Sequence, residues 1–163
     1  MKKVIVVSDT HGYTGNFDKV VEENKDAHLL IHLGDVCNDE QYINRKVHYA
    51  VKILKGNNDW SYELPEKAVM NIMGHKILAT HGHLYNVLFG VERLVWTARE
   101  LGCDIVLFGH THVPIVEEGD DLTLVNPGSL SYPRQMGHKP SYVIMMMDED
   151  GTVDYEIKYL EKE

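Results

Sequence analysis

The side chains best suited to bind metal ions or take part in catalysis lie in five short polar loops, each of which follows an apolar run. The loops combine aspartate, asparagine and histidine, which are residue types that bind transition metals. They read Asp9-Thr10-His11, Gly34-Asp35, Gly56-Asn57-Asn58-Asp59, His81-Gly82-His83 and Gly109-His110-Thr111-His112. Stability alone would not require five such loops in one small chain. The pattern therefore predicts a site that binds two metal ions and hydrolyses phosphate esters.

The ligand types restrict the metal. Imidazole and carboxylate ligands together suit Mn, Fe, Ni or Zn, whereas a shell of oxygen atoms alone would suit Mg or Ca. Asp35 follows the second expected strand and is our candidate for a carboxylate that bridges two ions about 3.5 to 4 Å apart. The other expected ligands form two sets, which are Asp9, His11 and His112 for one ion and Asn57, His81 and His110 for the other.

The charge of such a centre would favour a phosphorylated substrate. Two divalent ions and two carboxylates leave a local charge of about +2, in a chain whose formal charge is -9. Metal binding lowers the pKa of water from about 15.7 toward neutrality, so a hydroxide between the ions could attack phosphorus without a serine or cysteine nucleophile. The ions would also neutralise charge that develops in the transition state.

Strands and helices must bring these loops together. The β-branched run Val4-Ile5-Val6-Val7 is typical of a strand buried on both faces of an α/β sheet. Because ligands bind at the carboxyl ends of strands in open α/β sheets, we expect distant loops to converge there. The other expected elements are a helix capped by Asn16, a strand over 27–33, a helix over 39–50, a strand over 51–54, a hairpin of 67–73 and 76–79 around Gly74-His75, a helix over 91–101 ended by Gly102, a strand over 105–108, and strands from 115 onward, including 142–147, with turns at 119–121 and 150–151.

Length and composition favour one domain over residues 1–163, since 163 residues with 44% hydrophobic content can bury a substantial core. The net charge disfavours binding to nucleic acid, and a nuclease with it. Cys37 and Cys103 form no CxxC pair, and we find neither a leader peptide nor an apolar run that could cross a membrane. We therefore expect a cytoplasmic protein that acts on a small substrate, with a frayed tail at 161–163.

These motifs resemble those of the calcineurin-like metallophosphoesterases, and most closely the small YfcE-like phosphodiesterase branch. The resemblance covers nearly the whole chain and includes Gly12, Thr80 and the segment Asn126-Pro127-Gly128-Ser129. It implies an α/β fold in which a two-sheet β sandwich is flanked by helices, and a dinuclear centre often supplied with manganese. It also implies a preference for phosphodiesters and leaves a homo-oligomer open, because family members often pair. Our ligand assignment agrees with that of the family.

One position departs from the family pattern. Larger members place a histidine directly after the metal-binding asparagine, where it is thought to assist the leaving group, and this chain has Asn58 there. Because an amide cannot donate a proton as an acid does, we expect slower reaction with poor leaving groups. His83 would point away from His81 along an extended segment, so we expect it to contact a ligand or the substrate. Asp35, Asn58 and His83 are thus the candidate catalytic residues.

Several other residues have simpler explanations. Asp59 could cap its turn or orient a ligand, Cys37 is expected to pack, and Arg134 is either a surface charge or a residue that borders the site. We expect Met145-Met146-Met147 to lie in a buried strand, and large aromatic residues to close the core unless they line a groove. The aromatic residues are Trp60, Tyr62 and Trp96, and the histidines expected to be structural or on the surface are His28, His32, His48, His75 and His138.

A second function class remains open. The chain could be a non-catalytic metal-binding scaffold or interaction module of the same fold, as some eukaryotic relatives in trafficking complexes are. Such proteins tend to lose ligands, whereas every expected ligand position here carries an acceptable residue, which favours catalysis. Asn58 keeps the scaffold alternative open.

Overall fold

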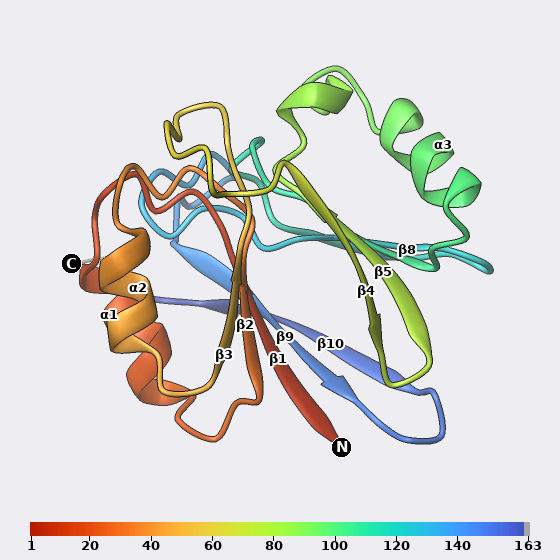
Figure 1. Ribbon diagram of the computed structural model, residues 1–163, viewed down its shortest axis with the longest axis horizontal. Helices are drawn as coiled ribbons and strands as arrows, with labels where there is room; N and C mark the ends of the chain where they lie inside the picture. Colours follow the sequence, from red (N-terminus) through yellow and green to blue (C-terminus); the bar gives the residue numbers. More distant parts are fainter. Residues whose placement is uncertain (162–163) are drawn as a thin grey trace.

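The computed structural model describes residues 1–161, so residues 162–163 of the frayed tail expected at 161–163 lie outside them. Within this range ten strands form two five-stranded sheets (Figure 1). The first contains β1 (Lys2–Val7), β2 (Leu29–His32), β3 (Ala50–Ile53), β9 (Ser141–Met147) and β10 (Val153–Tyr159). The second contains β4 (Lys67–Ile72), β5 (His75–Thr80), β6 (Ile105–Leu107), β7 (Ile115–Glu118) and β8 (Thr123–Asn126). The helices are α1 (Gly15–Glu23), α2 (Glu40–Lys46), α3 (Glu92–Glu100) and a 3₁₀ turn, η1 (His83–Tyr85).

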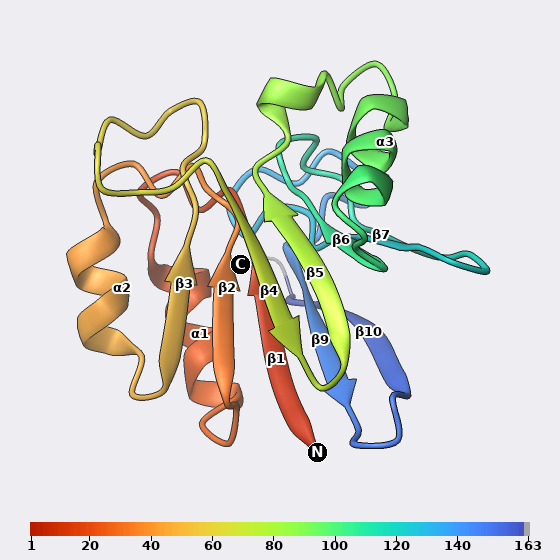
Figure 2. The same ribbon diagram turned by 45° about the vertical axis from the view of Figure 1, so that its right-hand side comes forward.

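The strand pairing places the polar loops at one edge of the molecule. The first sheet has the order β10-β9-β1-β2-β3 and the second the order β4-β5-β6-β8-β7. β1, β2 and β3 run parallel, and so do β5, β6 and β8. The loops after β1, β2, β3, β5 and β6 therefore gather at the upper edge in Figure 2. These are the five loops selected from the sequence.

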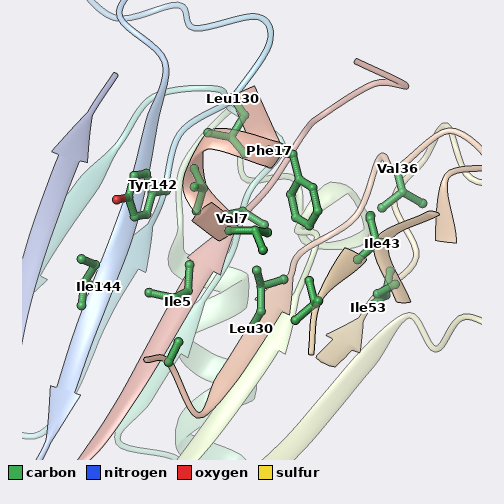
Figure 3. Close-up of a cluster of buried hydrophobic side chains, with 14 of the residues drawn as sticks. Ile5, Val7, Phe17, Leu30, Val36, Ile43, Ile53, Leu130, Tyr142 and Ile144 are labelled. Atoms are coloured by element: carbon green, nitrogen blue, oxygen red, sulfur yellow. The ribbon is translucent and has the colours of Figure 1, made fainter. Parts of the chain in front are cut away.

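Both faces of the first sheet are buried, as the β1 sequence predicts. Val4 and Val6 pack in the core between the two sheets, whereas Ile5 and Val7 point to the side covered by α1 and α2. Figure 3 shows this second cluster, in which Phe17 of α1 lies beside Val7. Burial of each large apolar side chain contributes about 1.5 to 3 kcal/mol, so the two clusters hold β1 firmly.

The second sheet is covered on its outer face by α3. Leu94 and Ala98 of this helix are fully buried in a cluster with Leu78 and Val106. The layers are therefore helices, sheet, sheet and helix, which confirms the expected two-sheet sandwich flanked by helices (Figure 1). No helix within residues 1–161 has the length and apolar character needed to span a membrane.

Two helix boundaries differ from the sequence prediction. Thr14, not Asn16, stands at the N-cap of α1, because the Asn16 side-chain amide instead donates a hydrogen bond of 2.7 Å to the Leu130 carbonyl. α2 ends at Lys46 rather than at residue 50, since Ala50 already pairs with Leu29 in the sheet. In both places a contact with a distant segment overrides the local preference.

Three large aromatic residues that were expected to close the core lie at the surface. Trp60, Tyr62 and Trp96 are 78%, 98% and 73% exposed, so the expectation that they are buried is wrong. Aliphatic residues make up most of the three core clusters, to which Phe17, Phe108 and Tyr142 also contribute. The methionine segment does form part of β9, where Met145 and Met147 are fully buried as expected.

His75 links the two sheets at the edge opposite the polar loops. Its Nδ1 lies 2.6 Å from Asp104 Oδ2, and its Nε2 lies 2.7 Å from the Gly151 carbonyl in the turn between β9 and β10. Both ring nitrogens face acceptors, so both must donate. Although burial lowers the pKa of His75, the hydrogen bonds to Asp104 and Gly151 outweigh this effect and raise the pKa above 6.5.

We expect this link to make stability depend on pH. A group whose pKa is raised by folding contributes fully to the stability of the folded protein when the pH is below the pKa of the unfolded state, here 6.5. This contribution is lost as the pH rises through the pKa of the folded state. Because Asp104 is 44% exposed, screening limits the effect to about 1 kcal/mol. Urea unfolding of the parent and of His75→Gln across this pH range measures it, with exposed His48→Gln as the control. A pH dependence in His75→Gln identical to that of the parent would contradict the expectation.

The loops after β2 and β3 pack backbone against backbone. A β-carbon at Gly56 would overlap the amide nitrogen and the carboxylate of Asp35. We expect Gly56→Ala to lower the free energy of unfolding by about 1 to 3 kcal/mol, because neither the buried carboxylate nor the backbone can move aside. Gly15→Ala is the matched control, since a β-carbon there meets no atom of the described residues within 4 Å. Urea unfolding compares the two variants, and equal stabilities would refute the expectation.

Candidate metal centre

The structure brings six of the seven expected metal ligands into two groups of three. Within each group the ligand atoms all lie within 4.8 Å of one another. Asp35 Oδ2 is 3.4 Å from His81 Nε2 and 3.6 Å from His11 Nε2, so it lies beside both groups, as a bridging ligand would. The groups are Asp9, His11 and His112, and Asp35, His81 and His110.

Asp9 provides the test of whether these residues fit a cation. Its carboxylate is fully buried, and Oδ2 accepts hydrogen bonds from the Ser8 hydroxyl at 2.6 Å and from the His110 amide at 3.1 Å. Among residues 1–161 Oδ1 has no hydrogen-bond partner, and it faces Nε2 of His112 at 3.1 Å and of His11 at 3.6 Å. A buried carboxylate oxygen without a partner is costly, and a divalent cation among these atoms would satisfy it. The residues therefore fit a metal ion.

Backbone carbonyls fix the orientation of two of the histidines. His81 Nδ1 lies 2.9 Å from the Leu33 carbonyl, and His112 Nδ1 lies 2.8 Å from the Tyr132 carbonyl. Each Nδ1–H must donate to its carbonyl, which leaves Nε2 facing the carboxylates, where it donates a hydrogen bond when protonated and would bind a metal ion when neutral. This tautomer is the one that binds metal.

The two carboxylates are ionised at neutral pH. Burial would raise the pKa of Asp9, but His11, His112 and His81 outweigh it and hold this pKa well below 3.8. For Asp35, hydrogen bonds from His81 and Asn58 likewise overcome burial and lower the pKa to about 2. The site thus holds two buried negative charges, and only an equal density of positive charge can stabilise them.

Most of the expected ligands have an unusual backbone conformation. Five of the seven have positive φ, a region that non-glycine residues rarely adopt and that is found at functional sites. The angles are 56° at Asp9, 49° at His11, 59° at Asp35, 69° at His110 and 61° at His112. Hydrogen bonds from neighbouring segments must hold these loops in place.

Asp59 supplies three of these hydrogen bonds. Its Oδ2 accepts from the backbone N–H of Asp35 at 2.7 Å and of Gly56 at 2.8 Å, and its Oδ1 accepts from the N–H of Cys37 at 2.8 Å. The sequence left open whether Asp59 caps its turn or orients a ligand. It does both, because the same carboxylate binds its own loop and the backbone of Asp35.

The end of β8 and the segment after it support the loops of the first group. The hydroxyl of Ser129 donates to the Asp9 carbonyl at 2.8 Å, and that of Ser131 donates to the Thr10 carbonyl at 2.7 Å. The Asn126 side-chain amide donates to the Gly109 carbonyl at 3.2 Å. The motif Asn126-Pro127-Gly128-Ser129 therefore borders the site through backbone contacts. Ser131 was not expected from the sequence, where a serine in a loop gives no distinguishing signal.

His32 has the structural role predicted for it. It is fully buried, its Nε2 lies 2.9 Å from the Thr10 hydroxyl, and its Nδ1 accepts from the Gly34 N–H at 3.1 Å. Burial lowers the pKa of His32 to about 3, so the ring stays neutral. His32 therefore ties the loop after β1 to the loop after β2, a role that its position in the sequence alone does not reveal.

The remaining expected site residues lie nearby. The Asn57 side chain is exposed and makes no hydrogen bond to the other expected ligands within residues 1–161, so its role as a ligand stays a prediction. Asn58 donates to Asp35 twice, through its backbone N–H to Oδ1 at 2.8 Å and through its side-chain amide to Oδ2 at 3.0 Å. The half-buried ring of His83 lies 5.4 Å from that of His81. His83 is thus close enough to contact the second group.

A groove of about 670 Å³ opens beside His11 and His112. We call it the Tyr132 groove, and it is lined by His11, Tyr13, Cys37, Asn58, His112, Tyr132, Pro133 and Arg134. Burial and nearby carboxylates raise the pKa of the Cys37 thiol to about 11, so Cys37 contributes a neutral thiol to the groove and no nucleophile. Trp60 and Tyr62 are not among the lining residues.

Known proteins of similar sequence carry phosphoesterase names. The chain is 29% identical over 150 residues to probable metallophosphoesterase YsnB of Bacillus subtilis, covering 91% of this chain and 86% of YsnB. It is 30% identical to phosphodiesterase YfcE of Escherichia coli, covering 92% of this chain and 89% of YfcE.

Solved structures share the fold. A predicted phosphoesterase of Streptococcus pneumoniae has a TM-score of 0.78 at 26% identity, covering 98% of both chains. Vps29 of Entamoeba histolytica in complex with Zn²⁺ has a TM-score of 0.76 at 26% identity, covering 96% of this chain and 98% of Vps29. Residues 1–150 match the family model described as the calcineurin-like phosphoesterase superfamily domain, and the chain therefore belongs to that superfamily.

Proposed function

We propose that the protein is a metal-dependent phosphodiesterase that hydrolyses small phosphodiesters at a centre for two divalent ions. The observation that carries this proposal is the pair of aspartate and histidine groups around the unpartnered Oδ1 of Asp9. Membership of the superfamily supports phosphoester hydrolysis. The similarity to a protein named phosphodiesterase YfcE supports a diester as substrate.

The donor set defines which ions the centre would hold. Nitrogen and oxygen donors together suit Mn, Fe, Ni or Zn, and we propose manganese as the native ion. When bound, the two ions would supply an activated water molecule and neutralise charge on the phosphoryl oxygens. Asp35 would be shared between the ions, while Asp9, His11 and His112 would hold one and Asn57, His81 and His110 the other.

Residues beyond the ligands would prepare the site for reaction. Asn58 fixes both oxygens of Asp35 through its two hydrogen bonds, so this carboxylate cannot rotate away from the centre. His83 lies next to the second group, where we propose that it contacts the substrate. The carboxylate of Asp59 accepts a hydrogen bond from the backbone N–H of Asp35 and so fixes its position. Together these contacts preorganise the ligands before a substrate binds.

A non-catalytic scaffold is the second candidate function. The likeness to Vps29, whose name marks it as a vacuolar protein sorting protein, favours it. A scaffold of this kind would bind metal and a partner protein without turnover. Every expected ligand position carries an acceptable residue, and six of these residues gather beside an open groove, which favours catalysis. Metal-dependent turnover separates the two candidates.

We also propose a cytoplasmic setting, which the unpaired state of Cys37 and Cys103 supports. Pairing of subunits, which the family resemblance implied, stays a prediction that sedimentation can test.

The function predicts that turnover requires both metal and Asp35. Manganese should stimulate release of p-nitrophenol from bis(p-nitrophenyl) phosphate, and Asp35→Asn should lower the rate by on the order of a hundredfold or more, because the shared charge is lost. Metal content after purification should fall in the same variant. Asp120→Asn, which alters an exposed turn, is the matched control. Hydrolysis at the parent rate by metal-free protein or by Asp35→Asn would disprove the proposal.

Because Asn58 stands at the position of the family's acid, we expect the rate of hydrolysis to depend strongly on the leaving group. Because no acid stands at this position, we expect bis(p-nitrophenyl) phosphate to react much faster than an alkyl phosphodiester. Asn58→His should accelerate the alkyl diester by up to about a hundredfold and the activated diester far less. Asn58→Ala controls for the lost hydrogen bonds to Asp35 and should slow both reactions alike. Equal rates of the parent protein on the two diesters would argue against this role of Asn58.

A further inference from the structure

The Tyr132 groove has an aromatic wall next to the metal centre. The ring of Tyr132 lies 5.3 Å from that of His11, at an interplanar angle of 81°, and 5.7 Å from that of Tyr13, at 76°. Tyr13 is 61% and Tyr132 46% exposed, so both rings present free surface. Exposed tyrosine rings offer a large, rigid and weakly polar surface on which a flat ring can stack.

This wall is fixed relative to the candidate ligands. The backbone N–H of Tyr132 donates to the Ser129 hydroxyl at 2.8 Å, and its carbonyl accepts from His112 Nδ1 at 2.8 Å. The same serine holds the Asp9 carbonyl. The backbone of Tyr132 therefore cannot shift without disturbing His112, and its ring, packed against those of His11 and Tyr13, stays beside the centre.

The groove is also suited to an anion. The formal charge of the chain is -9, yet none of the residues that line the groove is an aspartate or a glutamate. Arg134 lines it, and within residues 1–161 its guanidinium forms no ion pair or hydrogen bond. Its backbone N–H donates to the His112 carbonyl at 3.0 Å, which keeps the residue beside the site. A guanidinium without a protein partner is well suited to bind phosphate oxygens.

From these contacts we infer that the Tyr132 groove selects phosphodiesters with an aromatic ester group. Tyr13 and Tyr132 stack on an aryl or nucleoside ring, and Arg134 binds a phosphoryl oxygen of the same substrate. The volume of about 670 Å³ falls within the roughly 300 to 1,000 Å³ of small-ligand sites, so the groove accepts one nucleotide-sized group. This inference rests on the proposed phosphodiesterase function and specifies its substrate class.

Two diesters with the same leaving group test the aromatic wall. Bis(p-nitrophenyl) phosphate carries a second ring, whereas methyl p-nitrophenyl phosphate does not. Tyr13→Leu should lower kcat/KM for the diaryl ester about tenfold more than for the methyl ester. Tyr132→Phe keeps the ring and should retain the parent ratio. Arg134→Ala should raise KM for both esters about equally. The controls Trp96→Leu and Arg45→Ala alter exposed residues of α3 and α2.

Equilibrium binding separates this inference from the proposed function. In calorimetry with manganese-loaded protein, adenosine 5′-monophosphate should bind about tenfold more tightly than ribose 5-phosphate. Tyr13→Leu should remove this difference, and Arg134→Ala should weaken both ligands. Binding with these preferences but without any diester hydrolysis would overturn the phosphodiesterase function and leave the groove assignment standing. Hydrolysis with the same substrate ratio in parent and Tyr13→Leu, and equal binding of the two phosphates, would overturn the groove assignment alone.

Discussion

Two carboxylates buried where both sheets end are the constraint on which the rest of the molecule depends. Asp9 is fully buried and Asp35 is 1% exposed, and both keep a lowered pKa because histidines surround them. Buried charge is stable only when it is paired and hydrogen bonded. This explains why His81 and His112 are oriented by backbone carbonyls. The geometry of the centre follows from the need to neutralise these two charges.

The same constraint explains where the chain accepts strain. Each non-glycine residue held at positive φ costs on the order of 1 to 3 kcal/mol, although aspartate and histidine tolerate this region better than most. The ligand loops concentrate such residues, and Asp59 and Ser129 supply the hydrogen bonds that hold them there. The cores on both sides of each sheet provide the stability that offsets this cost. Strain and function thus share one edge of an otherwise regular sandwich.

The local pattern of the chain was sufficient to predict the ligand loops and most strands, because each loop directly follows an apolar run that forms a buried strand. The resemblance to a known family added the arrangement of two sheets. Other features depend on contacts between distant segments. Asn16 binds a carbonyl 114 residues away instead of capping its helix, and Ser131 supports a loop 121 residues away. Such pairings leave no local signal, and neither does the exposure of Trp60 and Tyr62.

The groove bears on the choice between catalysis and a scaffold role. The buried Oδ1 of Asp9, which has no hydrogen-bond partner among residues 1–161, favours a cation beside the groove and would do so in a metal-binding scaffold as well. The guanidinium of Arg134, which has no protein partner among residues 1–161, lines the same groove, and metal binding alone does not require such a group. Both features are useful to a site that must attract an anionic small molecule and hold it next to metal ions. The shape and charge of the groove therefore support turnover of a phosphate ester at this edge.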